Sequence, residues 1–254
     1  MDEIATLELA RLTDDSLDSG NRIQKALIEL HDTPASEAFS AITFMMSQAA
    51  EAKGQLFQDL WALWASGLKI GGYFVEFGAA SGVELSNTWL LEKKMGWRGI
   101  LAEPNPVFHD SLKANRTCDV TAKCVFARTG EQLEFLASHI PELGRLASVP
   151  ADDMHEKRRT RRPKVITVET ISLNDLLIEH GAPQTIDYLS IDTEGSELQI
   201  LEAFDFDRWD VRAITVEHNF TPQRQALYDL LVAHGYRRQL EGVSLYDDWY
   251  VKAR

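Results

Sequence analysis

Residues 72–82 read GYFVEFGAASG, an apolar run that passes directly into a turn of small residues. The run at 73–77 has the length and apolar character of a short buried strand. Glycine at 78 and 82 lets the backbone turn tightly and lets a ligand approach where a Cβ would clash. The spacing E-x-G-x-x-x-G differs from the G-x-G-x-x-G fingerprint of dinucleotide-binding folds. The stretch therefore predicts a strand, a turn and a ligand without a pyrophosphate.

Short apolar runs and helix-like stretches alternate along the rest of the chain. Four further strand-like runs lie at 100–103, 123–127, 186–192 and 212–217. The stretches typical of helices lie at 87–95, 108–115, 173–180 and 196–204. This alternation predicts an α/β fold with a mostly parallel sheet. After a last helix at 223–234, the segments 235–240 and 248–252 suit a C-terminal antiparallel hairpin. Five parallel strands and a closing hairpin are the layout of the Rossmann-like class I methyltransferase fold.

Residues 1–68 carry helical signals and no strand-like run, so we expect an N-terminal helical extension (1–68) before a methyltransferase domain (69–254). One helix is expected up to residue 30, and Pro34 suits the first turn of the next. That helix and a third at 55–68 are each expected to bury one face. The expected buried face of the helix after Pro34 comprises Phe39, Ile42, Met46 and Ala49. The expected buried face of the helix at 55–68 comprises Leu56, Leu60, Leu63 and Trp64. Residues 1–50 are expected either to cover the site or to form a homodimer contact.

The composition is that of a globular protein. The chain has 254 residues, 44% of them hydrophobic, and a formal net charge of −13, which disfavours binding to nucleic acids or anionic membranes. No apolar stretch approaches the roughly 18–20 residues of a membrane span, and the acidic N-terminus lacks a signal-peptide layout. Cys118 and Cys124 are too few for a zinc site or a disulfide scaffold. We expect a soluble, cytoplasmic protein.

Acidic residues stand at the ends of the first two predicted strands. Glu76 precedes the glycine turn, and Glu103 ends the second strand. A carboxylate at the second strand end can accept hydrogen bonds from both hydroxyls of a ribose. S-adenosylmethionine (SAM) combines a ribose with a cationic sulfonium and an ammonium group, which suit acidic neighbours. The two acids therefore predict SAM as the cofactor.

Polar residues also end the fourth and fifth predicted strands, at the sheet edge where ligands bind. Asp192 and Glu194 follow the fourth strand, and Glu217 and His218 end the fifth. Asp192, His218 or Glu194 would remove the proton from a hydroxyl that attacks a methyl carbon. Alternatively, Asp192, Glu217 and His218 would hold Mg²⁺ or Mn²⁺, which lowers the pKa of the hydroxyl. We prefer the metal-free base; the competing interpretation of Glu194 and Ser196 is that they only cap the next helix.

Several motifs, in order between about residues 50 and 252, resemble those of the FkbM family of SAM-dependent methyltransferases. They are KGQLFQDL (53–60), GYFVEFG (72–78), SNT (86–88), GWRGI (96–100), EPNP (103–106), IDTEGSE (191–197) and VEH (216–218). The resemblance implies SAM-dependent O-methylation of a hydroxyl on a sugar, a glycan or a secondary metabolite.

The resemblance also assigns residues to the cofactor. It implies that Glu76, Gly78 and Gly82 line the methionine side of SAM, that Glu103 contacts its ribose, and that Gln58 and Asp59 lie near its amino-acid end. The full predicted cofactor-binding set is Gln58, Asp59, Glu76, Gly78, Ala79, Gly82, Asn87, Glu103, Pro104, Asn105 and Asp192. The predicted catalytic set is Asp192, His218 and Glu194.

The segment HEKRRTRRPK at 155–164 carries six basic residues and one acidic residue. Such a run is typical of a solvated loop, and the alternative is a clamp for an anionic acceptor. Two further functions stay open beside O-methylation. One is N- or carboxyl-methylation of a small acceptor, and the other is a catalytically silent binding or scaffold protein with this fold.

Overall fold

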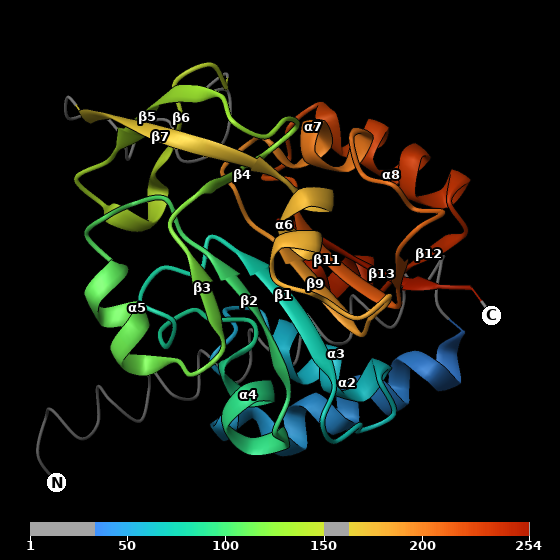
Figure 1. The fold of residues 1–254 in the computed structure, drawn as a ribbon. Helices are drawn as coiled ribbons and strands as arrows, with labels where there is room; N and C mark the ends of the chain where they lie inside the picture. The colour runs from blue at the N-terminus through green and yellow to red at the C-terminus, as the bar shows by residue number, and fades with distance from the viewer. Residues whose placement is uncertain (1–33, 150–162, 254) are drawn as a thin grey trace, which may run out of the picture.

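A computed structural model of the chain describes residues 34–149 and 163–253 (Figure 1). The helix expected up to residue 30 and most of the basic segment at 155–164 lie outside these residues. The described residues form three sheets, of seven, four and two strands, and the helices that pack around them; β8 (Thr185–Ile186) and β10 (Asp210–Val211) make the two-stranded one.

Seven strands form the main sheet, in the order β12-β13-β11-β9-β1-β2-β3. The first five strands of this sheet along the chain run parallel, and the last runs antiparallel to both of its neighbours. The strands are β1 (Tyr73–Phe77), β2 (Arg98–Ala102), β3 (Asp119–Thr121), β9 (Tyr188–Ile191), β11 (Ala213–Glu217), β12 (Tyr236–Gln239) and β13 (Asp247–Lys252). The expected class I methyltransferase sheet and its closing hairpin of β12 and β13 are thereby confirmed.

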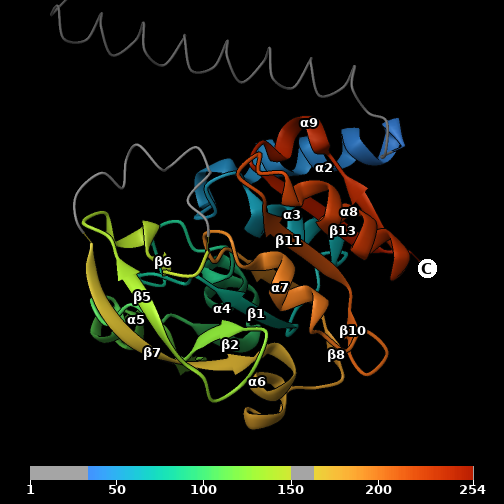
Figure 2. The same cartoon turned by 90° about the horizontal axis from the view of Figure 1, so that it is seen from above.

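Helices cover both faces of the main sheet (Figures 1 and 2). On one face pack α6 (Leu173–Glu179), α7 (Glu197–Glu202) and α8 (Gln223–Ala233). On the other pack α2 (Ala35–Gln48), α3 (Gln58–Ala65), α4 (Trp89–Met95) and α5 (His109–Asn115). Successive strand residues point to opposite faces, so Val75 joins the core with the first group and Phe74 the core with the second. Both faces are thus buried, which leaves the carboxyl edge of the sheet for ligands.

Helix α2 buries a face that matches the expected one only at Ile42. Its alanines Ala38 and Ala41 pack in the core with Ile42, whereas Phe39 and Met46 are 64% and 48% exposed. The small alanine side chains let α2 lie close to α3, so the larger apolar residues on the neighbouring stripe remain outside. The expected face of α3 is confirmed at Leu60 and Leu63, which are buried. The division of the chain at residue 68 stays a prediction.

A second, four-stranded sheet in the order β4-β7-β5-β6 lies beside the carboxyl edge of β2 and β3 (Figures 1 and 2). Its strands are β4 (Cys124–Phe126), β5 (Gln132–Ala137), β6 (Arg145–Leu146) and β7 (Lys164–Ser172). The run at 123–127 was predicted as the third strand of the main sheet, and this prediction was wrong. The strand that pairs with β2 in the main sheet is β3 (Asp119–Thr121). Strand β4 pairs with the long strand β7 of the second sheet.

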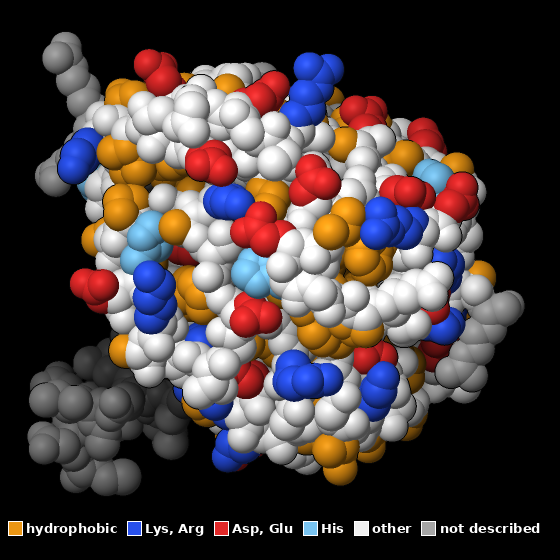
Figure 3. Space-filling view, in the orientation of Figure 1, with side chains coloured by type: hydrophobic (Ala, Val, Ile, Leu, Met, Phe, Trp, Pro, Cys, Tyr) orange, Lys and Arg blue, Asp and Glu red, His pale blue; other side chains and the backbone are white. Residues whose placement is uncertain are grey.

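The remaining elements are short: η1 (Ala49–Glu51), η2 (Pro141–Leu143), β8 (Thr185–Ile186), β10 (Asp210–Val211) and α9 (Glu241–Ser244). Acidic and basic side chains are interspersed over the face drawn in Figure 3, and the described residues form no extended basic surface there. None of the described helices has the length and apolar character needed to cross a membrane.

Candidate functional site

A cavity lies at the carboxyl ends of β1, β2 and β9, between the seven-stranded main sheet and the four-stranded sheet, which we call the small sheet. The main sheet and its turns contribute Gly78, Glu103 and Asp192, and the small sheet contributes Phe135 and Leu146. Among the described lining residues there is no Lys, Arg or His, whereas six are acidic: Glu84, Glu103, Glu142, Asp192, Glu194 and Asp247. The described walls therefore suit a ligand with positive charge.

The glycine turn after β1 has two separate structural roles. Gly78 lines the cavity with φ +72°, and a Cβ there would collide with the carbonyl oxygen of Asp192. Gly82 has φ +75°, and its Cβ would lie 2.5 Å from Leu112 and 2.7 Å from Arg116. Ala79 is buried in the core. Of the predicted cofactor residues in this turn, Gly78 reaches the cavity, while Gly82 and Ala79 pack against protein.

Glu76 does not line the cavity. It is buried, and its carboxylate accepts hydrogen bonds from the Asn87 amide at 2.7 Å and from the hydroxyls of Ser86 and Thr88. Arg116 lies 3.8 Å away. Burial raises the pKa of Glu76, and Arg116 opposes that rise. Glu76 therefore holds the segment 86–88 in place.

That segment carries Asn87, which does line the cavity. The Asn87 side-chain amide donates a hydrogen bond to Ser190 Oγ at 2.9 Å. Its Oδ1 is buried and has no donor among the described residues, so it keeps an acceptor for a ligand.

Glu103 is buried and faces the cavity from the first position after β2. One carboxylate oxygen accepts from the Ala80 amide at 2.9 Å, and the other accepts from the Asn105 amide at 2.8 Å. Each oxygen retains a lone pair, so the group can accept from two hydroxyls of a ligand. Burial raises the pKa of Glu103 to about 7.

The two residues after Glu103 differ in position. Pro104 lines the cavity. Asn105 does not, because its side-chain amide donates to the carbonyl of Pro141 at 3.1 Å. Asn105 thereby links the end of β2 to the small-sheet side of the cavity.

Gln58 and Asp247 form a second polar group of the cavity wall. Gln58 Nε2 donates to Asp247 Oδ2 at 2.8 Å, and burial raises the pKa of Asp247 to about 7. Asp59, the other residue predicted here, points elsewhere: it accepts from the amides of Lys53 at 2.7 Å and Leu60 at 2.9 Å. Burial raises the pKa of Asp59 as well.

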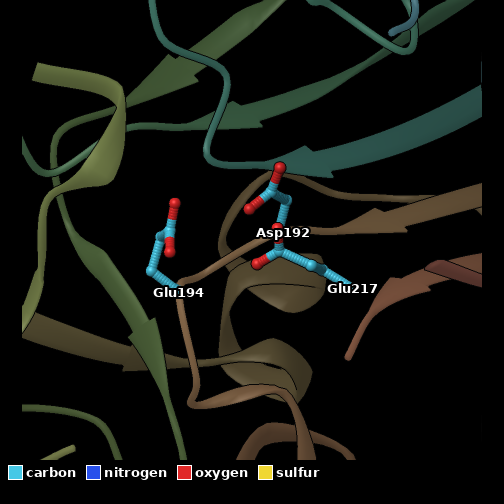
Figure 4. Close-up of side chains that lie close together, drawn as sticks. All are labelled: Asp192, Glu194 and Glu217. Atoms are coloured by element: carbon cyan, nitrogen blue, oxygen red, sulfur yellow. The ribbon is translucent and has the colours of Figure 1, made fainter. Parts of the chain in front are cut away.

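Asp192, Glu194 and Glu217 come together, with one oxygen of each lying within 4.8 Å of the others (Figure 4). Ile191 of β9 pairs with Val216 of β11, so the residues that follow them, Asp192 and Glu217, lie side by side. Asp192 is open to the cavity, whereas Glu194 and Glu217 are buried. Loss of solvent and the neighbouring carboxylates raise the pKa values of Asp192 and Glu217 well above normal.

The turn between β9 and α7 is stabilised by Glu197. Its carboxylate accepts from the amides of Thr193 at 2.9 Å and Gly195 at 3.0 Å and from the Thr193 hydroxyl. Ser196 precedes α7 but makes no side-chain cap bond, so the capping interpretation of Ser196 is wrong. Glu194 lies in the cavity wall with φ +58°.

His218 is buried and does not line the cavity. Its Nδ1 accepts a hydrogen bond from the Phe220 amide at 3.0 Å, and its Nε2 lies 3.7 Å from Asp248. Burial lowers the pKa of His218 to about 4. The ring is therefore neutral near pH 7, and its acceptor nitrogen is already occupied. The structure does not bring His218 together with Asp192.

Sequence reasoning missed Phe135, Leu146 and Asp247. A signal for Phe135 was present in the alternation of polar and apolar residues at 132–135, which is typical of a strand. Asp247 pairs with Glu217 across β13 and β11, so the hairpin register would have placed it at the site.

The chain is similar to several known proteins. An FkbM methyltransferase from Methylobacillus flagellatus has a similar structure at 13% identity (TM-score 0.47), covering 94% of this chain and 60% of that one. A precorrin-6y C5,15-methyltransferase from Geobacter metallireducens is similar at 14% identity (TM-score 0.39), covering 71% of each chain. No curated protein matches the chain. The methyltransferase FkbM domain matches residues 76–238, more than half of the sequence. The protein therefore belongs to the FkbM family of methyltransferases.

Proposed function

We propose that the protein transfers the methyl group of SAM to a hydroxyl of a sugar, a glycan or a secondary metabolite. The observation that carries the proposal is the shared cavity. Glu103, suited to a ribose, and Asp192, suited to a base, are the first residues after two parallel strands and open into the same space. Family membership supports methyl transfer, and the hydroxyl acceptor is our inference.

The residues of the cavity fit SAM. The carboxylate of Glu103 has lone pairs left for both ribose hydroxyls. Asn87 Oδ1, which lacks a donor among the described residues, and Asp247 are acceptors for an ammonium group. Gln58 holds Asp247 in position through its 2.8 Å hydrogen bond. When bound, SAM supplies the electrophilic methyl group, and the acidic walls favour its positive charge.

Asp192 is the proposed general base. Its carboxylate opens into the cavity, and its raised pKa makes it a stronger base than an aspartate with the ordinary pKa. It would accept the hydroxyl proton as the oxygen attacks. His218 is less suitable as the base because its Nδ1 already accepts a hydrogen bond from the Phe220 amide.

The acidic walls also favour a neutral acceptor group at the reaction centre. A phosphate or carboxylate beside Asp192 and Glu194 would be repelled. An anionic acceptor would depend on the basic segment at 155–164, whose clamp role stays a prediction, as does the homodimer.

Calorimetry and an isotope assay test the proposal. Titration of the full chain with SAM should give one-to-one binding, and ¹⁴C-methyl SAM should label hydroxyl acceptors from a panel that also contains amines and carboxylic acids. Labelled amines or acids alone would favour the other methyltransferase reactions. The absence of SAM binding would favour the silent scaffold.

A further inference from the structure

Three carboxylates from two strand ends meet at the cavity, where Asp192 and Glu194 line the wall and Glu217 is buried behind them. Asp192 and Glu217 are adjacent through the β9–β11 register, and Glu194 reaches them from the turn that follows β9 (Figure 4). Their closest oxygens lie within 4.8 Å of one another. Like charges at this separation favour uptake of positive charge, either as protons or as a cation.

A second observation concerns Glu217 alone. Its side chain is 7% exposed, and Oε2 is buried without a hydrogen-bond donor among the described residues. Neither Asp192 nor Glu217 forms an ion pair with a Lys or Arg in the described ranges 34–149 and 163–253. Buried carboxylate oxygens are normally satisfied, so the unpartnered oxygen of Glu217 is a free acceptor for a cation or a proton at the cluster.

We propose that Asp192, Glu194 and Glu217 bind a divalent cation of the Mg²⁺ or Mn²⁺ class. Carboxylate oxygens are the ligands that these hard cations prefer. Oxygens on opposite sides of Mg²⁺ lie about 4.2 Å apart, since each bond is about 2.1 Å, so the 4.8 Å limit of the cluster accommodates the ion after small adjustments. Water molecules would complete the coordination through the open side at Asp192.

This ligand set differs from the one expected from the sequence. Glu194 takes the place of His218, whose Nδ1 is occupied by the Phe220 amide. Three carboxylates suit Mg²⁺ and Mn²⁺ better than a ligand set with an imidazole does, because imidazole also suits Zn²⁺.

The cation would deepen the proposed function. A hydroxyl that binds it would lose its proton more readily, and the second oxygen of Asp192 would remain available as the proton acceptor. This consequence rests on the proposed methyl transfer, whereas cation binding itself does not.

Direct binding measurements test the site on the full chain. Mn²⁺ titrated at pH 7.5 and followed by the electron paramagnetic resonance of the free ion should show one site with a Kd below about 1 mM. Glu217→Gln and Glu194→Gln should each weaken binding at least about tenfold, because each removes one charged ligand. Mg²⁺ should displace the bound Mn²⁺.

Glu142→Gln is the matched control, since Glu142 lines the same cavity outside the cluster. It should change the Kd less than about twofold if local ligation and not the general negative field holds the ion. Two folded Gln variants are included so that instability of one does not prevent the test. No Mn²⁺ binding below about 1 mM, or equal binding by wild type and both cluster variants, would overturn the cation site.

SAM calorimetry on the same samples separates the two proposals. SAM binding without Mn²⁺ binding overturns the cation site and leaves the proposed function standing. Mn²⁺ binding that depends on Glu194 and Glu217, without SAM binding, supports the site and overturns the proposed function.

Discussion

Glu76 and Glu103 are acids at the carboxyl ends of neighbouring parallel strands, but they have different surroundings. Glu76 lies within β1, and its side chain contacts Arg116 and the segment 86–88. Glu103 is the first residue after β2 and opens into the cavity. Glu76 follows the alternation of β1 into a helix layer, whereas Glu103 lies just beyond the last paired residue of β2 and turns toward the cavity.

Position just after a strand does not by itself place a side chain in the cavity, as Asp192 and His218 show. Asp192 is the first residue after β9 and faces the cavity. His218 is the first after β11, but its amide donates to the Tyr246 carbonyl at 2.8 Å. The chain therefore continues alongside the hairpin, and the imidazole points away from the cavity.

The largest expected effect compares Asp192 with His218. Asp192→Asn should lower kcat by about 10²–10⁴, because an amide cannot accept the hydroxyl proton. His218→Gln should leave kcat within about tenfold, since the ring is outside the cavity. Steady-state rates with a labelled hydroxyl acceptor measure both. A larger loss in the His218 variant, with the fold intact by thermal melting, would reverse the assignment.

The next effect is on stability at Glu76. Glu76→Ala should reduce the free energy of unfolding by about 3 kcal/mol, because three buried donors lose their acceptor and Arg116 keeps only Glu92 as a buried counter-charge. Glu76→Gln should cost less, since an amide oxygen still accepts. Urea denaturation measures both changes. A loss below about 1 kcal/mol for the Ala variant would contradict the buried network.

Substitution of Glu103, the acid that opens into the cavity, should affect SAM binding more than stability. Glu103→Gln should weaken SAM binding about tenfold, through loss of charge-assisted hydrogen bonds to the ribose, with a smaller loss of stability than Glu76→Ala. Calorimetry measures the affinity. Glu84→Gln, an exposed acid at the same cavity, is the control and should bind SAM within about twofold of wild type. Equal affinities of all three proteins would remove Glu103 from the ribose site.

The smallest effect is on the pH dependence of stability. The pKa of Glu103 is raised from 4.5 to about 7 in the folded protein, so the native state binds more protons than the unfolded state between these values. Stability should therefore fall as pH rises through this window. Glu103→Gln should lessen that fall by about 1 kcal/mol between pH 6 and 7. Urea denaturation at both pH values checks this, and an unchanged slope would show that Glu103 does not titrate there.

Local patterns predicted the main sheet well because buried parallel strands are short apolar runs with glycine or acidic residues after them. The run at 123–127 has the same composition as a main-sheet strand, and only long-range pairing with β7 assigns it elsewhere. The face of α2 depended on the close approach of alanines to α3, which periodicity does not reveal.

The site was predicted in part for a similar reason. Glu103 and Asp192 follow strands directly, so sequence position indicated their place at the cavity. Asp247 and Phe135 come from segments that are distant in sequence, and they reach the site only through sheet pairing and packing.

The small sheet has a further consequence for how such an enzyme diversifies. Its first and last strands, β4 and β7, lie side by side, with Cys124 paired to Thr170 and Phe126 to Ser172. A segment whose two ends are neighbours can be lengthened, shortened or grafted from a relative without cutting the seven-stranded scaffold. Since Phe135 and Leu146 of this segment form one wall of the cavity, such an exchange would reshape that wall beside an unaltered Glu103.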